Sequence, residues 1–194
     1  MARKQFIGMI ITGLATIIPV GAISSSTALG QTSIDLATVR STALSKHNTY
    51  RATHHSPNMT LSNSLNDSAQ TWAQYLASKA VLQHSSPSQR NNAGENLYVS
   101  YTTATSIAAA TLADKVVTSW YNEVLSYNYT NPGFSDKTGH FTQVVWKSST
   151  QLGCGAAQGT ATINGTKYNA FYLVCHYAPA GNVTGQFPNN VLKP

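Results

Sequence analysis

The sequence predicts an α+β fold, a three-layer α-β-α sandwich with a small antiparallel sheet. Three observations support this prediction. Apolar residues recur at helical spacing in three segments, an Asn-Gly pair separates two extended segments, and the second extended segment is apolar on both faces over residues 170–174. A strand of that kind is covered on both sides, and the three predicted helices are the available cover.

The first 30 residues have the composition of a cleaved secretory signal peptide. They begin with two basic residues, continue with an apolar stretch over residues 6–23, contain no acidic residue and end in small residues at Gly30. We therefore expect a secreted, extracellular protein that begins at Gln31 and forms one domain over residues 31–194. A retained membrane anchor is the alternative, but three glycines and one proline interrupt the apolar stretch.

The mature part is mildly basic, and its cations are scattered singly. The whole chain has 12 Lys and Arg against 6 Asp and Glu, and charged residues make up 9% of it. No run or stripe of cations predicts a nucleic-acid partner, and no later stretch is long and apolar enough for stable membrane insertion. Five Asn-x-Ser/Thr sequons permit glycosylation in a eukaryotic secretory pathway: Asn58, Asn66, Asn128, Asn164 and Asn182.

Apolar stripes predict the three helices. The first covers residues 36–50, with Ser33 as its cap and Asp35 in its first turn. The second covers residues 65–80, and the third covers residues 112–124. Each stripe leaves a polar face for solvent, as expected of helices that cover a sheet.

The strongest geometric prediction concerns a hairpin. Asn164-Gly165 favours a two-residue turn, and counting outward from this turn places Cys154 opposite Cys175, the two cysteines of the chain. In a secreted protein such a facing pair is expected to form a disulfide. The strand before the turn also carries small residues that let another element approach closely: Gly153, Gly155, Ala157 and Gly159.

Four residues are candidates for chemistry. Glutamate occurs only at Glu95 and Glu123, and a carboxylate beside an apolar stripe needs a partner. Histidines are the natural partners, among them His84 at the end of the second predicted helix and His140. Their spacing forms no compact metal motif, so separate structural roles stay an open alternative. The neighbouring pair His54-His55 is interpreted as a solvated helix end rather than a metal site.

Five segments resemble the signatures of the CAP superfamily, which covers cysteine-rich secretory proteins, antigen five and pathogenesis-related class-one proteins and is built on the SCP domain. The resemblance is greatest to its Pry-like secreted members and spans nearly the whole mature chain. The segments are HNTYR (47–51), AGENLY (93–98), WYNEV (120–124), YNYTNPGFSDKTGHFTQVVWKSSTQLGCG (127–155) and YLVCHYAPAGNVTGQF (172–187).

This resemblance implies an α-β-α sandwich in which His84, Glu95, Glu123 and His140 converge in one open cleft. It also implies that the two histidines can hold a divalent metal, zinc or magnesium, although the sequence does not require one. With the resemblance in view, residues 140–146 are better interpreted as a short helix that begins at His140. Gln143, one turn further on, would donate a hydrogen bond to the cleft or satisfy backbone groups.

Three functions follow as alternatives. The resemblance implies binding of a sterol or fatty acid at an aromatic loop, although its aromatic residues could instead only pack the loop onto the domain. A metal-dependent hydrolase, in particular a protease, would use Glu95 or Glu123 as general base. A secreted effector would act through a protein partner. The sequence does not decide whether the protein is an enzyme, and no catalytic residue is assigned; lipid binding without turnover is the expectation. The loop residues are Tyr127, Tyr129, Pro132, Gly133 and Phe134.

Overall fold

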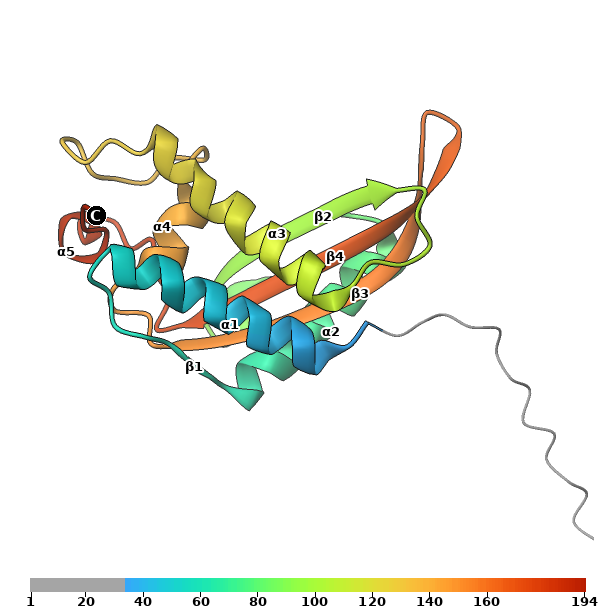
Figure 1. Ribbon diagram of the computed structural model, residues 1–194, viewed down its shortest axis with the longest axis horizontal. Helices are drawn as coiled ribbons and strands as arrows, with labels where there is room; N and C mark the ends of the chain where they lie inside the picture. Colours follow the sequence, from blue (N-terminus) through green and yellow to red (C-terminus); the bar gives the residue numbers. More distant parts are fainter. Residues whose placement is uncertain (1–33) are drawn as a thin grey trace, which may run out of the picture. The chain divides into compact units, whose positions relative to one another are not determined.

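The computed structural model describes residues 34–194. The predicted signal peptide, its cleavage site and the Ser33 cap lie outside the described residues, so the boundary at residue 30 stays a prediction. No helix in the described part of the chain is long and apolar enough to cross a bilayer. The elements are α1 (Leu36–Thr53), β1 (Thr60–Leu61), α2 (Asn63–Lys79), the 3₁₀ helix η1 (Pro87–Arg90), β2 (Gly94–Thr102), α3 (Ala109–Asn122), the 3₁₀ helix η2 (Glu123–Ser126), α4 (Gly139–Val145), β3 (Gln151–Ile163), β4 (Thr166–Ala178) and α5 (Phe187–Asn190) (Figure 1).

The predicted α+β fold is confirmed, with one correction to the sheet. Its strand order is β1-β3-β4-β2, and β4 pairs antiparallel with both β2 and β3. The two-residue strand β1 pairs with β3 in parallel, so the sheet is mixed and not purely antiparallel. A strand of two residues is too short to show any alternation of apolar residues, and a parallel pair forms only through a long crossover connection.

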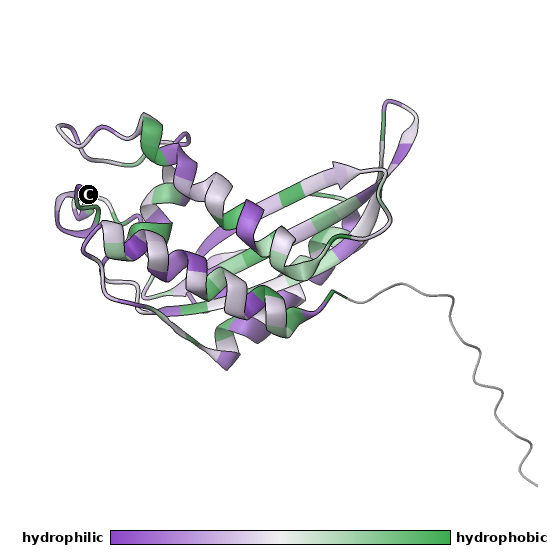
Figure 2. Ribbon diagram, viewed as in Figure 1, coloured by the Kyte–Doolittle hydropathy of each residue, from purple (hydrophilic) through white to green (hydrophobic). Residues whose placement is uncertain are grey.

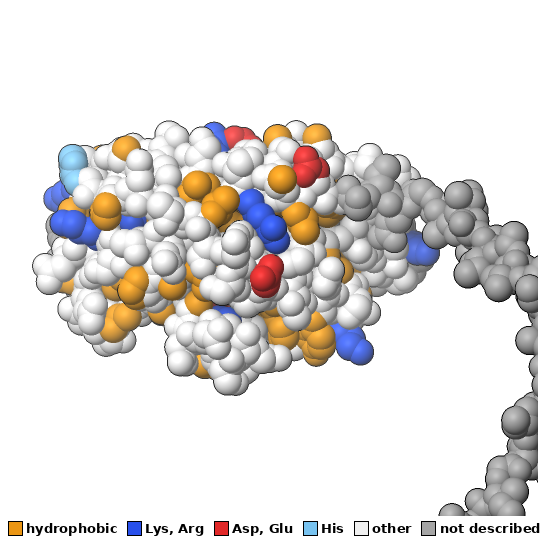
Figure 3. Space-filling model, turned by 90° about the horizontal axis from the view of Figure 1, so that it is seen from below, with side chains coloured by type: hydrophobic (Ala, Val, Ile, Leu, Met, Phe, Trp, Pro, Cys, Tyr) orange, Lys and Arg blue, Asp and Glu red, His pale blue; other side chains and the backbone are white. Residues whose placement is uncertain are grey.

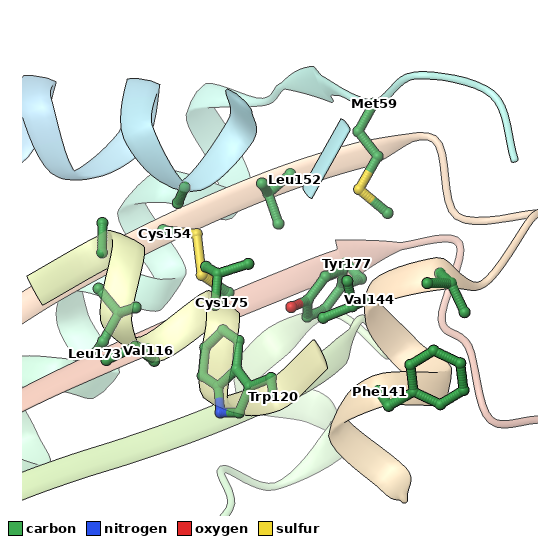
Figure 4. Close-up of a cluster of buried hydrophobic side chains, with 14 of the residues drawn as sticks. Met59, Val116, Trp120, Phe141, Val144, Leu152, Cys154, Leu173, Cys175 and Tyr177 are labelled. Atoms are coloured by element: carbon green, nitrogen blue, oxygen red, sulfur yellow. A yellow bond between two sulfur atoms is a disulfide. The ribbon is translucent and has the colours of Figure 1, made fainter. Parts of the chain in front are cut away.

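Helices cover both faces of the sheet, with α1 and α3 on one side and α2 on the other (Figure 1). The consecutive residues of β4 alternate between the two cores, which explains why this strand is apolar on both faces. Phe171, Leu173 and Cys175 pack with α1 and α3, where Figure 4 shows Leu173 and the disulfide near Trp120. Tyr172 belongs to the second core, beneath α2. Along α1, Figure 2 shows both apolar and polar residues, and the buried ones, Val39, Ala43, His47 and Arg51, recur every fourth residue on one side of the helix.

The predicted hairpin register is confirmed. Asn164 and Gly165 form the turn, and Cys154 lies opposite Cys175 in the β3–β4 ladder. The two cysteines form a disulfide, with their Cα atoms 4.2 Å apart (Figure 4). The turn therefore sets the register of the two cysteines, which lie nine residues along each strand from the pair Ile163 and Thr166, because no bulge interrupts the ladder.

The small residues of β3 let α2 rest directly on the sheet. A Cβ atom added at Gly155 would overlap the backbone of Gln70 in α2, and one added at Gly153 would overlap the backbone of Leu65 and Asn66. The close contact also satisfies peptide groups of β3. Asn66 accepts from the backbone N–H of Cys154 at 3.0 Å, and Gln70 accepts from that of Ala156 at 2.9 Å.

Three local predictions were wrong. Asp35 is the N-cap of α1 and not a first-turn residue, and its carboxylate accepts from the N–H groups of Ala37 and Thr38. Helix α2 ends at Lys79 with Ala80 in the left-handed conformation, so His84 lies in the following segment. His54 is fully buried at the end of α1 and is not solvated.

We predict that Gly155→Ala destabilises the protein by about 1–3 kcal/mol, because the new methyl group would push α2 away from β3. Urea unfolding of both proteins would measure the change. Gly133→Ala is the matched control, since nothing lies within 4 Å of its Cβ position, and it should stay within about 0.5 kcal/mol of the parent. Equal stability of all three proteins would contradict the close packing of α2 on β3.

Candidate functional site

A pocket of about 220 Å³ brings three of the four predicted residues together. His84, Glu95 and His140 line it, and Glu123 forms a hydrogen bond to His140. They come from four different places in the fold: the segment after α2, the start of β2, the first residue of η2 and the first turn of α4. Their spacing in the sequence does not predict that they meet, because the contacts between them depend on how β2 and α4 pack together in the fold.

The first histidine–glutamate pair joins His84 to Glu95. The Nδ1 atom of His84 lies 2.6 Å from a Glu95 carboxylate oxygen. Ser85 donates to the same carboxylate twice, from its backbone N–H at 3.0 Å and from its hydroxyl at 2.8 Å. Only 1% of the Glu95 side chain is exposed, against 62% of His84. The buried carboxylate thus holds an exposed imidazole in place.

The second pair joins His140 to Glu123. The Nδ1 atom of His140 lies 2.6 Å from one Glu123 oxygen. The other oxygen accepts from the backbone N–H groups of His140 and Phe141 at 3.0 and 3.1 Å. These N–H groups belong to the first turn of α4, where no backbone carbonyl of the helix can accept from them. The Glu123 carboxylate therefore both caps the start of α4 and orients the ring of His140.

Strand β2 supports the second pair through Asn96. Its side-chain nitrogen donates to the backbone carbonyl of His140 and to the hydroxyl of Tyr177, both at 3.1 Å. The Tyr177 hydroxyl lies 2.9 Å from His47, which is fully buried in α1. The ring of Trp120 stacks on His140 with centroids 6.0 Å apart. Neighbouring residues of one strand thus contact both halves of the site.

His176 is a further participant that the sequence analysis missed. Its Nε2 atom lies 3.0 Å from the second Glu95 oxygen, and its Nδ1 atom lies 2.8 Å from the Ser68 hydroxyl. The His176 side chain is 1% exposed. A signal was available, since His176 follows Cys175 on a strand that is buried on both faces, and a buried imidazole needs a partner.

The charge state of Glu95 follows from these contacts. Burial by itself raises the pKa of Glu95, but hydrogen bonds from His176, His84 and Ser85 outweigh burial and lower that pKa to about 2. Glu95 is therefore a carboxylate at neutral pH. Since Glu95 accepts from Nδ1 of His84, that nitrogen carries a proton, and Nε2 of His84 forms no hydrogen bond in the described chain.

The donor set fits an imidazole-bound metal. Histidines that ligate metals commonly donate their second ring N–H to a carboxylate, and both His84 and His140 do so. Their Nε2 atoms are left as the two candidate ligands. Within residues 34–194, no group of three or more His, Cys, Asp and Glu side chains forms a metal cluster. A metal held here would keep other coordination positions for water or a ligand, as in open zinc sites.

The aromatic loop divides into anchors and an exposed tip. Tyr127 is buried, with its ring 4.8 Å from that of Tyr129 and 5.4 Å from that of Phe141. Phe134 is 60% exposed and lines the 220 Å³ pocket beside His140. Pro132 and Gly133 are half-buried between them. Packing onto the domain thus accounts for the two tyrosines but not for Phe134.

At least two further pockets lie in the described chain. One of about 360 Å³ shares His84, Glu95 and Asn182 with the first pocket and extends toward Arg90. Gln143 lines it but satisfies protein groups, accepting from the backbone of Gly181 at 2.9 Å and donating to the Ser149 hydroxyl at 3.2 Å. The other pocket, of about 400 Å³, lies at the starts of α1 and α3.

The remaining histidine pair forms no site. His54 lies 2.7 Å from the Leu192 carbonyl through Nδ1 and 3.0 Å from the Tyr121 hydroxyl through Nε2. Its neighbour His55 is exposed and has a positive φ of 55°. Since both ring nitrogens of His54 have protein partners, the pair offers no shared metal position.

The chain belongs to the CAP superfamily. Residues 44–177 match the family model described as CAP, the cysteine-rich secretory protein family. Among its relatives the chain stands close to the Pry-like proteins.

Two relatives are each 39% identical to this chain over the residues that align. The Golgi-associated plant pathogenesis-related protein 1 of Homo sapiens is 39% identical over 154 residues, which cover 78% of this chain and 90% of that protein. Protein PRY2 of Saccharomyces cerevisiae is 39% identical over 150 residues, 77% of this chain but 40% of that protein. The chain thus spans less than half of the yeast relative.

Solved structures share the fold. The crystal structure of NaASP2 with Zn²⁺ has a TM-score of 0.61 at 24% identity, covering 81% of this chain and 87% of that one. The crystal structure of MpPR-1i has a TM-score of 0.55 at 20% identity, covering 81% and 98%. These likenesses support the α-β-α architecture described above.

We predict that Glu95 makes the protein sensitive to acid. Because its folded pKa of about 2 lies below the ordinary value of 4.5, the unfolded chain binds the proton first as the pH falls. The stabilisation, on the order of 3 kcal/mol, is present above pH 4.5 and is lost between pH 4.5 and 2. Urea unfolding of the parent and of Glu95→Gln across this range would measure it.

The variant should be less stable at pH 7 and should lack the stability change that the parent shows in this window. Asp67→Asn is a control that removes an exposed carboxylate from α2 and should leave the window in place. If stability falls by the same amount in the parent and in Glu95→Gln between pH 4.5 and 2, Glu95 is not the source of the acid sensitivity.

Proposed function

We propose that this protein is secreted and binds a sterol or related lipid outside the cell, with the polar end of the ligand in the 220 Å³ pocket. The observation that carries the proposal is the position of Phe134. It exposes a large aromatic ring to water at a pocket that also contains His84 and His140. Exposed apolar groups that border polar pockets are characteristic of ligand sites.

The size of the pocket supports a ligand that is only partly enclosed. Pockets that bury a whole drug-sized ligand are about 300–1,000 Å³, so this pocket would take a head group only. The apolar remainder of the lipid would lie on Phe134 and the adjoining loop.

Secretion is supported by the N-terminal sequence pattern and by the name of one relative. Secreted protein RBT4 of Candida albicans is 39% identical over 163 residues, which cover 78% of this chain and 40% of that protein. Figure 3 shows the Lys and Arg side chains of one face separated by uncharged groups, without a continuous basic stripe. This face therefore offers no continuous cationic surface for a polyanion.

His84 and His140 are the residues that would hold a divalent metal, and their carboxylate partners would position them. Zinc suits imidazole ligands better than magnesium, which prefers oxygen, and one solved structure of this fold was determined with Zn²⁺. When bound, the ion would supply positive charge for the polar end of a ligand.

Hydrolysis is the less favoured function. Each oxygen of Glu95 and Glu123 already accepts a hydrogen bond from the protein. A general base works best with a pKa near the working pH, and the pKa of Glu95 is about 2. Both carboxylates are therefore better suited to orienting imidazoles than to taking a proton from water.

We predict that Phe134→Ala weakens the binding of a labelled sterol about tenfold, because the exposed ring supplies apolar contact at the pocket. Equilibrium titration of the purified mature protein would measure the affinity, with competition by unlabelled sterol and a parallel titration with a fatty acid. Leu125→Ala is the matched control, because Leu125 is 89% exposed nearby in sequence but does not line the pocket. No saturable binding of either lipid by the folded, disulfide-bonded parent would refute the proposal.

We also predict that His84→Ala and His140→Ala each abolish measurable Zn²⁺ binding in calorimetry, since one imidazole seldom suffices for a zinc site. His55→Ala removes an exposed histidine elsewhere and should bind Zn²⁺ like the parent. If His55→Ala loses binding while His140→Ala keeps it, the metal lies elsewhere. Repeating the sterol titration with Zn²⁺ shows whether the ion contributes to ligand affinity.

A further inference from the structure

We propose that Asn58, Asn128 and Asn164 carry N-linked glycans and that Asn66 and Asn182 carry none in the folded protein. The proposal rests on the secretion proposed above, because N-glycosylation occurs in the secretory pathway. Each of the five residues begins an Asn-x-Ser/Thr sequon, so the sequence alone does not separate them. Their surroundings in the fold do.

Asn128 has the best-formed acceptor geometry. It is exposed, and its side-chain oxygen accepts from the backbone N–H of Thr130 at 2.9 Å and from the Thr130 hydroxyl at 2.7 Å. The sequon hydroxyl is thus bonded to the carbonyl of the amide that would be modified. In the described chain the nitrogen of that amide forms no hydrogen bond, so it is available for attachment of a sugar.

The other two open sites also lie at the surface. Asn164 is exposed at the tip of the β3–β4 hairpin, and the Cβ position of its neighbour Gly165 has no atom within 4 Å. Asn58 is exposed in the segment between α1 and β1. A glycan at either place would extend into solvent without moving a strand or a helix.

Asn66 cannot carry a glycan in the folded protein, because it lies between α2 and the sheet. The residue is 3% exposed, and its side-chain oxygen accepts from the backbone N–H of Cys154 at 3.0 Å. The sequon hydroxyl, on Ser68, is bonded to His176 at 2.8 Å. A sugar attached to Asn66 would separate α2 from β3, so a molecule modified there could not reach this fold.

Asn182 is unavailable for a different reason, since both the nitrogen and the oxygen of its side-chain amide already form hydrogen bonds. Its nitrogen donates to the Gly139 carbonyl at 2.9 Å, and its oxygen accepts from the Thr142 hydroxyl at 2.6 Å. It also lines both pockets that contain His84. A glycan at Asn182 would fill the site proposed for the ligand.

The chemistry needs only what the secretory pathway supplies. The amide nitrogen loses a proton and forms a bond to the first sugar of an oligosaccharide carried on a lipid diphosphate, and the lipid diphosphate leaves. A glycan on Asn128 would keep the outer end of the loop at residues 127–134 in water. Phe134, on the pocket side, would stay free to contact a ligand.

The test is site-by-site glycan mapping of the full chain made in a yeast secretory host. Disulfide-bonded protein from the medium would be treated with peptide N-glycosidase in heavy-oxygen water, which labels each former glycan site, and then digested for mass spectrometry. We expect label at Asn58, Asn128 and Asn164 and none at the other two. Thr130→Ala should remove one glycan, whereas Thr184→Ala, in the sequon of Asn182, should remove none.

Label at Asn66 or Asn182 in the secreted protein would overturn the proposal, and so would an unlabelled Asn58, Asn128 or Asn164. Retention of the chain inside the cells would instead contradict the proposed secretion. A second version, in which a yeast secretion leader precedes the full chain, would then still deliver the five sequons to the same enzymes. The glycan map and the secretion result are thus separate outcomes.

Discussion

The structure around the 220 Å³ pocket depends on the buried carboxylate of Glu95. A carboxylate with 1% of its side chain exposed is stable only where protein donors replace water. Those donors come from His84 and Ser85, which follow α2, and from His176 on β4. The hydrogen bonds that Glu95 accepts hold the segment after α2 against the sheet and orient the ring of His84. Because Asn96, the next residue of β2, holds the carbonyl of His140, the same short stretch of strand also positions the second half of the site.

The two halves are anchored in physically different ways. Glu123 is held by backbone N–H groups of α4, so the position of His140 follows from the formation of that helix. Glu95 is held mainly by side chains, and its histidine is the more exposed of the two, 62% against 35%. Both arrangements leave the Nε2 atoms of the imidazoles unused by the carboxylates. Together with Phe134 they create a small polar pocket with an apolar border, which suits the polar end of an amphipathic molecule better than a reaction that needs a free base.

Local spacing in the sequence was sufficient to predict the three long helices α1, α2 and α3, the hairpin register and the facing cysteines, because each depends on a pattern along the chain; α4 was predicted only with the family resemblance in view. It was not sufficient for β1, whose two residues show no pattern, or for the end of α2, because Ala80 adopts a left-handed conformation that its own residue type does not favour. The meeting of His84, Glu95, Glu123 and His140 came from the family resemblance and not from spacing, since the pairing of β2 with β4 and the position of α4 create it. His176 could have been found by asking what partner a histidine on a doubly buried strand would need.

We propose that the aromatic tip and the histidine pair form one ligand site. Nuclear magnetic resonance of the mature protein, titrated with a water-soluble sterol ester, tests this claim most directly, because every backbone amide and imidazole reports separately. If one site binds the ligand, the signals of Phe134, Gly139 and His140 shift together with one saturation curve. Shifts confined to the pocket at the starts of α1 and α3, near Ile107 and Phe171, would contradict it, because the ligand would then bind without either the loop or the histidines.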